Sequence, residues 1–447
     1  MTAAPPTAGM PLPESLWRDS SFWGMTATQF LGAFNDNLYK EAALLVCVDV
    51  APQGEDYQKY AQAAFAVPFV LFSGFAGYLS DRTSKRRIVI LCKIVEVAIV
   101  ALGALAMLGQ HFGPMLGVIF LMGTHSAFFG PSKYGILPEI VREKNLPLAN
   151  GIFLMTTFLA IIFGMGAAGF VKGPIWDNGK WQYSAAFLGV AATGILTSLF
   201  VRRTPPAQPG LPFEWSSLAV SRETMQVIRR DRPLFVALIM FSLFWLVAGV
   251  VQSSVNEFGK KQLGLNDAHT AQMLAVLSLG IALGCAAAGK LSGEKANFRL
   301  VPWGAWGICA ALALVAGSGL VPIPRRAAAV LATGFLFLVG GATGVFSVPM
   351  QVFLQGRPPA AQKGRVIGAM NLFNWVGICL AAAVYGILIW GINRLQLPKA
   401  NLFAACAVFM LPIAVLYRPK ETPKPDERRP ETTAASALSE VRIAELE

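Results

Sequence analysis

The sequence predicts an all-α membrane protein with twelve transmembrane helices arranged as two halves of six. Three observations support this class. The 447 residues are 55% hydrophobic and only 14% charged, whereas soluble domains carry charge on about a quarter of their residues. The mean hydropathy is +0.54. Apolar windows of about 20 residues recur along the chain, and each is long enough to cross about 30 Å of hydrocarbon.

The apolar windows fall into two sets on either side of a Pro-rich, polar stretch at 202–231. In the first half they lie at 22–50, 57–80, 85–108, 114–137, 147–171 and 181–201. In the second half they lie at 232–256, 268–293, 299–320, 327–354, 364–391 and 399–417.

The segments around these windows complete the expected domain organisation. Residues 1–20 are Pro-rich and lack the basic start and the small-residue cleavage site of a signal peptide. We expect them to form a cytoplasmic N-terminal segment, followed by a bundle at 21–201, a cytoplasmic linker at 202–231 with a short amphipathic helix, and a bundle at 232–418. Residues 419–447 are charged and Pro-rich, so we expect a disordered cytoplasmic tail.

The formal net charge of +12 arises from 37 lysines and arginines against 25 acids. With a cytoplasmic N-terminus, most of these basic residues fall in cytoplasmic segments, as the positive-inside rule requires. The sequence therefore predicts that both termini are cytoplasmic. Topology and contact with anionic membrane lipids explain the basic excess, which therefore does not indicate nucleic-acid binding.

A charged turn follows the second window, with the sequence GYLSDRTSKRR from Gly77. Gly77 would let two helices approach closely, and Asp81 stands at a helix end where it can meet the N-terminus of a neighbouring helix. Arg82, Arg86 and Arg87 can pair with this acid or with lipid phosphate. We interpret the turn as a conformational latch.

The second half contains a weaker copy of this turn, GKLSGEKANFRLV from Gly289. Gly293 stands where Asp81 does, so we expect the latch to be asymmetric. The first turn resembles the loop signature of major facilitator transporters, and parallel repeats are an architecture of that superfamily. The resemblance implies the major facilitator fold.

The first window carries an unusual polar run, in which Asp36 and Lys40 stand four residues apart with Asn37 beside them. Each charge at mid-membrane costs about 3 kcal/mol on insertion scales, and this spacing places the acid, the amide and the base on one helix face. One interpretation is an internal salt bridge that neutralises the window. The polar sequence FNDN exceeds that need, so we expect Asp36 on the wall of a water-filled cavity.

The fourth window ends with Lys133 and Tyr134 between Pro131 and Pro138. We expect the two prolines to break the helix here, as Pro349 would end the equivalent window in the second half. A lysine at such a break can hold a phosphate as a point charge. It can equally be an interfacial lysine whose charge reaches water.

Other polar residues within the windows allow two interpretations. Lys93 and Glu96 could pair near the cytoplasmic interface, with Lys93 extending to water, and His125 could be a hydrogen-bonded packing residue or a proton relay. In the second half, four residues can either bind a lipid headgroup or satisfy one another between helices; they are Gln252, Asn256, Asn371 and Asn374.

The sequence contains no signature of an enzyme or of a resident cofactor. It has no Walker A loop, no HExxH or GxSxG motif and no cluster of metal ligands. None of His111, His125 and His269 is followed five residues later by Asp, so the H-x-x-x-x-D box of glycerolipid acyltransferases is absent. We therefore expect a transporter that needs no cofactor or metal.

Four segments resemble the bacterial lysophospholipid transporter family: QFLGAFNDNLYK (29–40), GPSKYGILPE (130–139), NLPLANG (145–151) and GKLSGEKANFRLVPWGAWG (289–307). They are similar above all to the transport domain that some bacteria fuse to a 2-acylglycerophosphoethanolamine acyltransferase. The resemblance extends over roughly residues 15–418.

This resemblance implies a flippase of the bacterial inner membrane that works by alternating access with lateral substrate access. It would move lysophosphatidylethanolamine, with lysophosphatidylglycerol as a further candidate, to the inner leaflet for reacylation by a separate acyltransferase. The family's headgroup acid and lysine correspond to Asp36 and Lys133. Some members have an arginine in the seventh window, where this chain has Gln252 and Ser253.

Two other functions are compatible with the same residues. One is a proton-coupled exporter of small amphipathic compounds that uses Asp36 as its protonation site. The other is a membrane scaffold that recruits an acyltransferase, which would leave the costly intramembrane charges unexplained.

Overall fold

The fold was analysed in a computed structural model that describes residues 12–50, 57–109, 111–171 and 174–419. Within these ranges the chain forms helices and connecting segments, without a β-strand. The expected tail at 420–447 and residues 1–11 lie outside the described residues.

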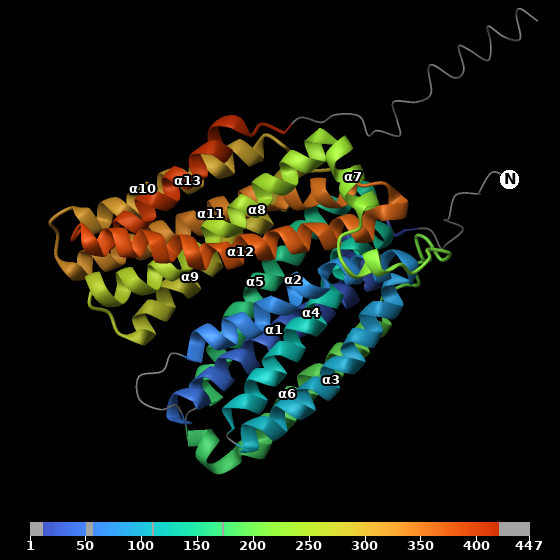
Figure 1. Cartoon of the computed structure of the whole chain (residues 1–447), viewed down its shortest axis with the longest axis horizontal. Helices are drawn as coiled ribbons and strands as arrows, with labels where there is room; N and C mark the ends of the chain where they lie inside the picture. Colours follow the sequence, from blue (N-terminus) through green and yellow to red (C-terminus); the bar gives the residue numbers. More distant parts are fainter. Residues whose placement is uncertain (1–11, 51–56, 110, 172–173, 420–447) are drawn as a thin grey trace, which may run out of the picture.

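Two sets of six long helices form the two halves (Figure 1). The first half comprises α1 (Ser20–Val50), α2 (Tyr57–Arg82), α3 (Lys85–Gly109), α4 (Phe112–Ile140), α5 (Leu146–Val171) and α6 (Pro174–Leu199). The second comprises α8 (Arg232–Glu257), α9 (Asp267–Ser292), α10 (Leu300–Leu320), α11 (Arg325–Gly356), α12 (Lys363–Arg394) and α13 (Asn401–Leu416). The linker holds a 3-10 turn at Trp215–Leu218 and the short helix α7 (Arg222–Arg230).

Nine helices in the described part of the chain are long and apolar enough to cross a membrane. This finding makes the chain a multi-pass membrane protein. α13 is shorter, at 16 residues, and α6 contributes only the apolar stretch Ser184–Leu199 within the residues searched.

The expectation that prolines end the fourth window of each half was wrong. α4 continues through both Pro131 and Pro138, and α11 continues through Pro349. Inside a membrane protein, neighbouring helices and side chains can satisfy the carbonyl groups that a proline leaves free, so the helix persists.

The two halves meet along two seams, α2 against α12 and α5 against α9. Glycines make both seams narrow: Gly77 lies against Gly368, and Gly151 against Gly289. On the first seam the rings of Phe69 and Trp375 stack with centroids 4.0 Å apart.

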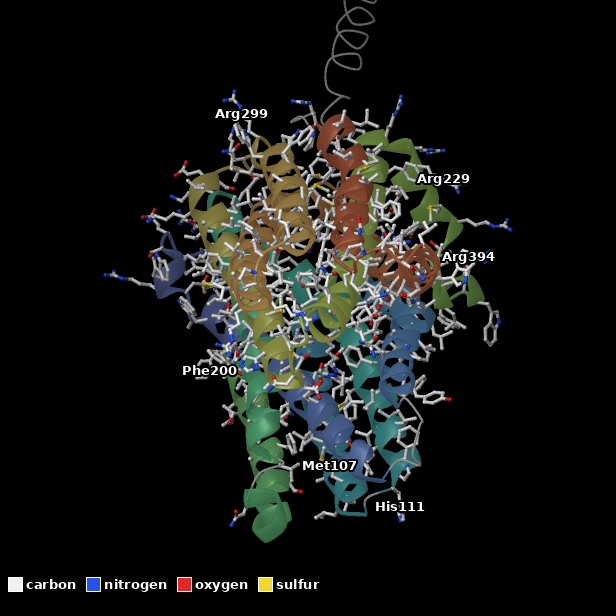
Figure 2. The ribbon with its side chains drawn as sticks, turned by 90° about the vertical axis from the view of Figure 1, so that its left-hand side faces the viewer. Met107, His111, Phe200, Arg229, Arg299 and Arg394 are labelled. Carbon is white, nitrogen blue, oxygen red and sulfur yellow. The ribbon has the colours of Figure 1, made fainter. Side chains whose placement is uncertain are left out.

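The seams begin at the end of the bundles where residues 202–231 lie, which we call the linker end. From there the halves diverge toward the opposite end (Figure 1). Figure 2 looks onto that opposite end, with the second half above the first. The molecule is therefore closed at the linker end.

Candidate functional site

The polar run on α1 lies inside the first half and faces α4. Asp36 is half-buried, and its Oδ2 accepts a hydrogen bond from the Ser126 hydroxyl of α4 at 2.6 Å. Its Oδ1 is buried and has no hydrogen-bond donor among the described residues. The neighbouring Asn37 donates to the carbonyl of Ala33 at 2.8 Å. One carboxylate oxygen of Asp36 is therefore left without a hydrogen-bond partner among the described residues in this state.

Lys40 is oriented toward an aromatic ring of α2 rather than toward a carboxylate. Its Nζ lies 5.3 Å from the centroid of the Phe65 ring, a cation–π geometry. Within the described residues no ion pair joins Lys40 to Asp36. The simple neutralising pair between these two residues is thus not formed in this state.

A buried ion pair on α3 packs against α1 near Asp36. Lys93 Nζ lies 2.5 Å from Glu96 Oε2, and the two side chains are 0% and 2% exposed. His125 Nε2 stands 3.7 Å from the same Glu96 oxygen. The Lys93 ammonium packs against Gly32 of α1, where a side chain would collide with it.

The expectation that Lys93 extends to water was therefore wrong. It stands eight residues into α3, about 12 Å along the helix, and Glu96 offers a closer partner than the interface. Gly32 of α1 and Gly194 of α6 both pack against the Lys93 side chain, and glycines in these windows are the signal that could have indicated an inward lysine.

Lys133 lies on α4 in an aromatic setting without an anion. Its Nζ is 5.1 Å from the centroid of the Tyr134 ring and 5.5 Å from that of Phe153 on α5. No carboxylate lies within ion-pair distance of it among the described residues. Asp36 and Lys93 are the charged groups that act on it electrostatically. This leaves a half-exposed cation without a counter-ion in the core of the protein.

The α-carbons of Asp36 and Lys133 lie at different distances from the linker end, but their side chains extend so that the two charges lie closer together. Asp36 stands 16 residues into α1 from the linker end, and Lys133 seven residues before the end of α4, which puts the two α-carbons about 14 Å apart in depth. A helical side chain leans toward the N-terminus of its helix, and for Lys133 this direction leads away from the linker end, toward the depth of Asp36. The arrangement therefore offers a cation and an anion along one path inside the first half.

The second half contributes amides to this region from α12. The Asn371 amide packs against Gly130 of α4, three residues before Lys133. Asn374 is buried, and its Oδ1 has no hydrogen-bond donor among the described residues. By contrast, Gln252 and Asn256 of α8 are exposed and, within the described residues, form no hydrogen bond with the charged residues. The structure thus brings Asn371 to the candidate site but leaves the α8 amides apart from it.

The Asp81 carboxylate lies at the first turn of α12, in the other half of the molecule. It accepts hydrogen bonds from the backbone N–H groups of Gly364 at 2.6 Å and Arg365 at 3.0 Å. The Arg365 guanidinium completes the cluster, with Nε 3.3 Å from the carboxylate. An anion at a helix N-terminus satisfies N–H groups that have no partner within the helix.

The arginines of the charged turn have other partners. Arg82 donates to the Tyr78 hydroxyl at 2.5 Å, and Arg86 donates to the carbonyl of Val201 at 2.5 Å, beyond the end of α6. Arg87 is exposed. The cation that pairs with Asp81 is Arg365, which sequence analysis missed because 284 residues separate the two.

The turn of the second half that corresponds to the Asp81 turn makes no charged contact between the halves among the described residues. Gly293 ends α9 with φ +63°, and no atom lies close to the position of a side chain there. Instead, Asn150 of α5 and Gln355 of α11 exchange two amide hydrogen bonds of 3.1 and 2.9 Å between the halves. The α2–α12 seam thus has an ionic contact, whereas the α5–α11 contact is made by neutral amides.

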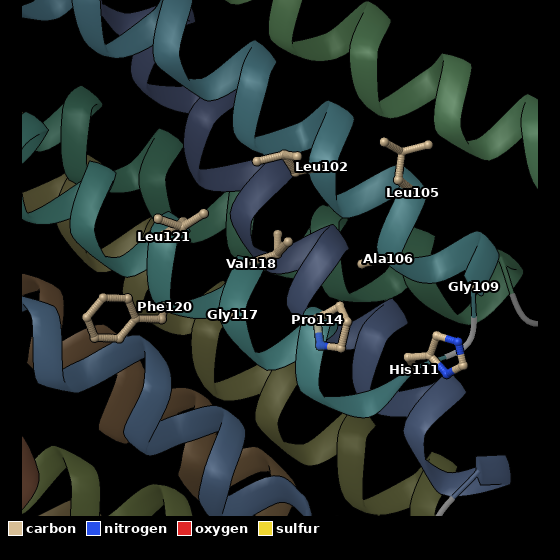
Figure 3. Close-up of a pocket in the computed structure, with 10 residues that line it drawn as sticks. All are labelled: Leu102, Leu105, Ala106, Gly109, His111, Pro114, Gly117, Val118, Phe120 and Leu121. Atoms are coloured by element: carbon tan, nitrogen blue, oxygen red, sulfur yellow. The ribbon is translucent and has the colours of Figure 1, made fainter.

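A separate apolar groove of about 600 Å³ lies between α3 and α4, far from the linker end (Figure 3). Leu102, Leu105 and Leu121 line it and are strongly exposed. None of the intramembrane charged residues lines this groove. It belongs to the outer, lipid-facing surface rather than to the polar site.

The sequence model of the Major Facilitator Superfamily matches residues 53–382. The chain belongs to the major facilitator superfamily.

Solved structures of this superfamily share the fold. The transporter FucP, in an outward conformation, aligns with a TM-score of 0.66 at 14% identity, over 90% of this chain and 99% of its own. A bacterial homologue of the iron transporter ferroportin, in an outward-facing state, aligns with a TM-score of 0.66 at 10% identity, over 88% of this chain and 99% of its own.

Two bacterial relatives are named lysophospholipid transporter. The lysophospholipid transporter LplT of Enterobacter sp. (strain 638) is 28% identical over 389 residues, which cover 84% of this chain and 92% of that protein. LplT of Escherichia coli O1:K1 / APEC is 26% identical over 390 residues, with the same coverage.

Proposed function

We propose that this chain is a lysophospholipid transporter of the bacterial inner membrane. It moves lysophosphatidylethanolamine-type lipids, and lysophosphatidylglycerol as a further substrate, from the outer to the inner leaflet by alternating access. A separate acyltransferase then restores the second acyl chain. The relatives named lysophospholipid transporter support this substrate class.

One observation carries the proposal: the first half presents an unpaired cation and a carboxylate with a free oxygen. Lys133 has aromatic rings around it but no counter-ion among the described residues, and Asp36 Oδ1 has no donor there. A zwitterionic headgroup supplies both missing partners, with its phosphate at Lys133 and its amine at Asp36. In lysophosphatidylglycerol a glycerol hydroxyl takes the place of the amine as the donor to Asp36. We assign Asn371 and Asn374 to the same headgroup site, while roles for Asn37, Lys40, Tyr134, Gln252 and Asn256 stay predictions.

We further propose that the twelve long helices each cross the membrane and that the linker end faces the cytoplasm. Arg82, Arg86 and the α7 arginines lie at this end, in agreement with the positive-inside rule. Both termini then lie in the cytoplasm. The described state is closed on the cytoplasmic side, so it is the state that receives lipid from the outer leaflet, by lateral access between helices.

The test is transfer of fluorescently labelled lysophosphatidylethanolamine between leaflets of proteoliposomes, with Asp36→Asn and Lys133→Gln as variants. Each loses a charge-assisted contact worth about 1.5 to 3 kcal/mol, so we expect the transfer rate to fall by about ten- to a hundredfold. Asp267→Asn and Lys144→Gln make the same changes at exposed positions and should transfer like the unmodified protein.

Absence of transfer by the unmodified protein would contradict the proposal, as would full activity in both site variants. A proton-coupled exporter of small amphipathic compounds is not favoured, because the two relatives described above are named lysophospholipid transporter. No enzymatic role is proposed for this member of a transporter superfamily.

A further inference from the structure

The linker exposes large apolar side chains that a water-facing loop would avoid. Trp215 is 82% exposed, Phe213 48% and Leu218 41%. Phe213 and Trp215 pack edge to face with centroids 6.2 Å apart, so they form one surface. An exposed aromatic cluster of this kind marks a site of contact with a protein or a membrane.

This aromatic surface continues the lipid-facing side of α2. The Phe213 ring lies 6.3 Å from that of Phe75 and 6.0 Å from that of Tyr78 on α2. One turn before Phe75, Leu71 of α2 is 54% exposed, as expected for a membrane span facing hydrocarbon. The linker aromatics therefore sit where the span leaves the bilayer, the level at which Trp is enriched in membrane proteins.

Next to these aromatic residues, the helix α7 carries exposed basic residues. Arg222, Arg229 and Arg230 are exposed, while Thr224 and Ile228 are buried beneath them. Arg229 projects from the rim of the molecule when it is viewed along the bundles (Figure 2). A helix with arginines at its edge, next to membrane-level aromatics, matches anionic lipid headgroups.

Linker residues also contact Arg365, the arginine that pairs with Asp81. Arg365 Nη1 lies 2.9 Å from Glu223 of α7, and its Nη2 donates to the Gln208 side chain at 2.8 Å. Gln362, which precedes α12, donates to Glu223 at 2.7 Å. The Ala219 backbone also packs directly on Gly74 of α2. Movement of the linker thus changes how Arg365 is held.

We propose that residues 211–230 form a docking surface for anionic phospholipids of the leaflet at the linker end, and that docking stabilises the state closed at that end. Phe213, Trp215 and Leu218 insert into the interface, and the α7 arginines contact the headgroups. Glu223 and Gln208 transmit this contact to Arg365 and Asp81. The inference needs the membrane position of the linker, but not the identity of the transported lipid.

The experiment uses the full chain in nanodiscs of phosphatidylcholine, with or without phosphatidylglycerol, and with its six native cysteines replaced. A fluorophore on Ser216→Cys, at an exposed linker position, reports membrane contact through quenching by brominated lipid against aqueous iodide. Ser73→Cys, at a fully buried position of the α2–α12 seam, reports opening at the linker end through its rate of alkylation.

We expect the fluorophore to be quenched by brominated lipid, and phosphatidylglycerol to slow alkylation of Ser73→Cys severalfold. Replacing Arg222, Arg229 and Arg230 together by Gln should abolish the effect of phosphatidylglycerol on alkylation. Glu223→Gln should keep the quenching but lose that effect, which separates lipid contact from its transmission to the latch. Arg299→Gln, an exposed arginine outside the linker, should change neither measurement.

Quenching by iodide alone would overturn the proposal, because the surface would then face water. An alkylation rate that ignores phosphatidylglycerol in the unmodified linker would also overturn it. Concentration-dependent association that Trp215→Ser abolishes would assign the surface to a second copy of the chain instead. None of these results depends on lysophospholipid transfer, so the proposed transport function stands or falls separately.

Discussion

The charged residues within the helices of the first half differ in whether they have a counter-ion. Lys93 and Glu96 satisfy each other at 2.5 Å in a fully buried setting, whereas Lys133 has no counter-ion among the described residues. A lone charge in the membrane interior is costly, so its retention points to a ligand that supplies the partner. This contrast favours a supporting role for Lys93 and Glu96, and it agrees with the ligand-binding role proposed for Lys133 and Asp36.

If Lys93 and Glu96 stabilise the fold through their ion pair, replacing either one should destabilise the protein. Lys93→Met or Glu96→Leu alone leaves a buried charge unpaired, so each should destabilise the protein by about 3 to 5 kcal/mol. The double variant removes both charges and should recover much of that loss. Thermal unfolding of purified protein measures this, with the exposed Lys144→Met as the control. A double variant as unstable as the single ones would contradict the pairing.

At the level of elements, sequence patterns predicted the helices well but not the contacts between distant ones. Except at the start of α6, which begins seven residues before the expected window, the apolar windows fall within about three residues of the observed helix ends. They do so because a membrane span must satisfy its own backbone. The prediction that helices end at Pro131, Pro138 and Pro349 was wrong. The local sequence does not show which neighbouring groups bind the carbonyl oxygens that a proline leaves without a hydrogen bond. Asp81 was expected to meet a helix N-terminus, and α12 is the helix that it meets.

The α2–α12 contact predicts how a latch variant shifts the conformational equilibrium. Asp81→Asn removes an anion from the first turn of α12, a loss of roughly 2 kcal/mol, or about thirtyfold in the equilibrium. Opening at the linker end should bring the opposite ends of the halves together. Spin labels at His111→Cys and His269→Cys, both exposed in the original chain, should show a larger population of short distances.

Arg87→Gln is the matched control for this measurement, because Arg87 belongs to the same charged turn but is exposed. Its distance distribution should equal that of the unmodified latch. An unchanged distribution in Asp81→Asn would show that the contact does not govern closure at the linker end.

For the whole molecule, the asymmetry between the halves is the central feature. The first half carries the intramembrane charges Asp36, Lys40 and Lys133, and the second contributes amides such as Asn371. Closure at the linker end combines an ionic contact on the α2–α12 seam, Asp81 with Arg365, and a neutral contact between α5 and α11, Asn150 with Gln355. A headgroup bound mainly by one half can stay with that half while the other rocks past it, as alternating access requires.

The most direct test of headgroup recognition by opposite charges is competition during transfer. Labelled lysophosphatidylethanolamine is reconstituted with the unmodified protein, and unlabelled lipids of the same acyl chain compete with it. We predict that lysophosphatidylethanolamine slows transfer of the label, whereas monoacylglycerol, which lacks the charged headgroup, leaves the rate unchanged. Equal competition by monoacylglycerol would show that the acyl chain alone is recognised and would contradict the roles of Asp36 and Lys133.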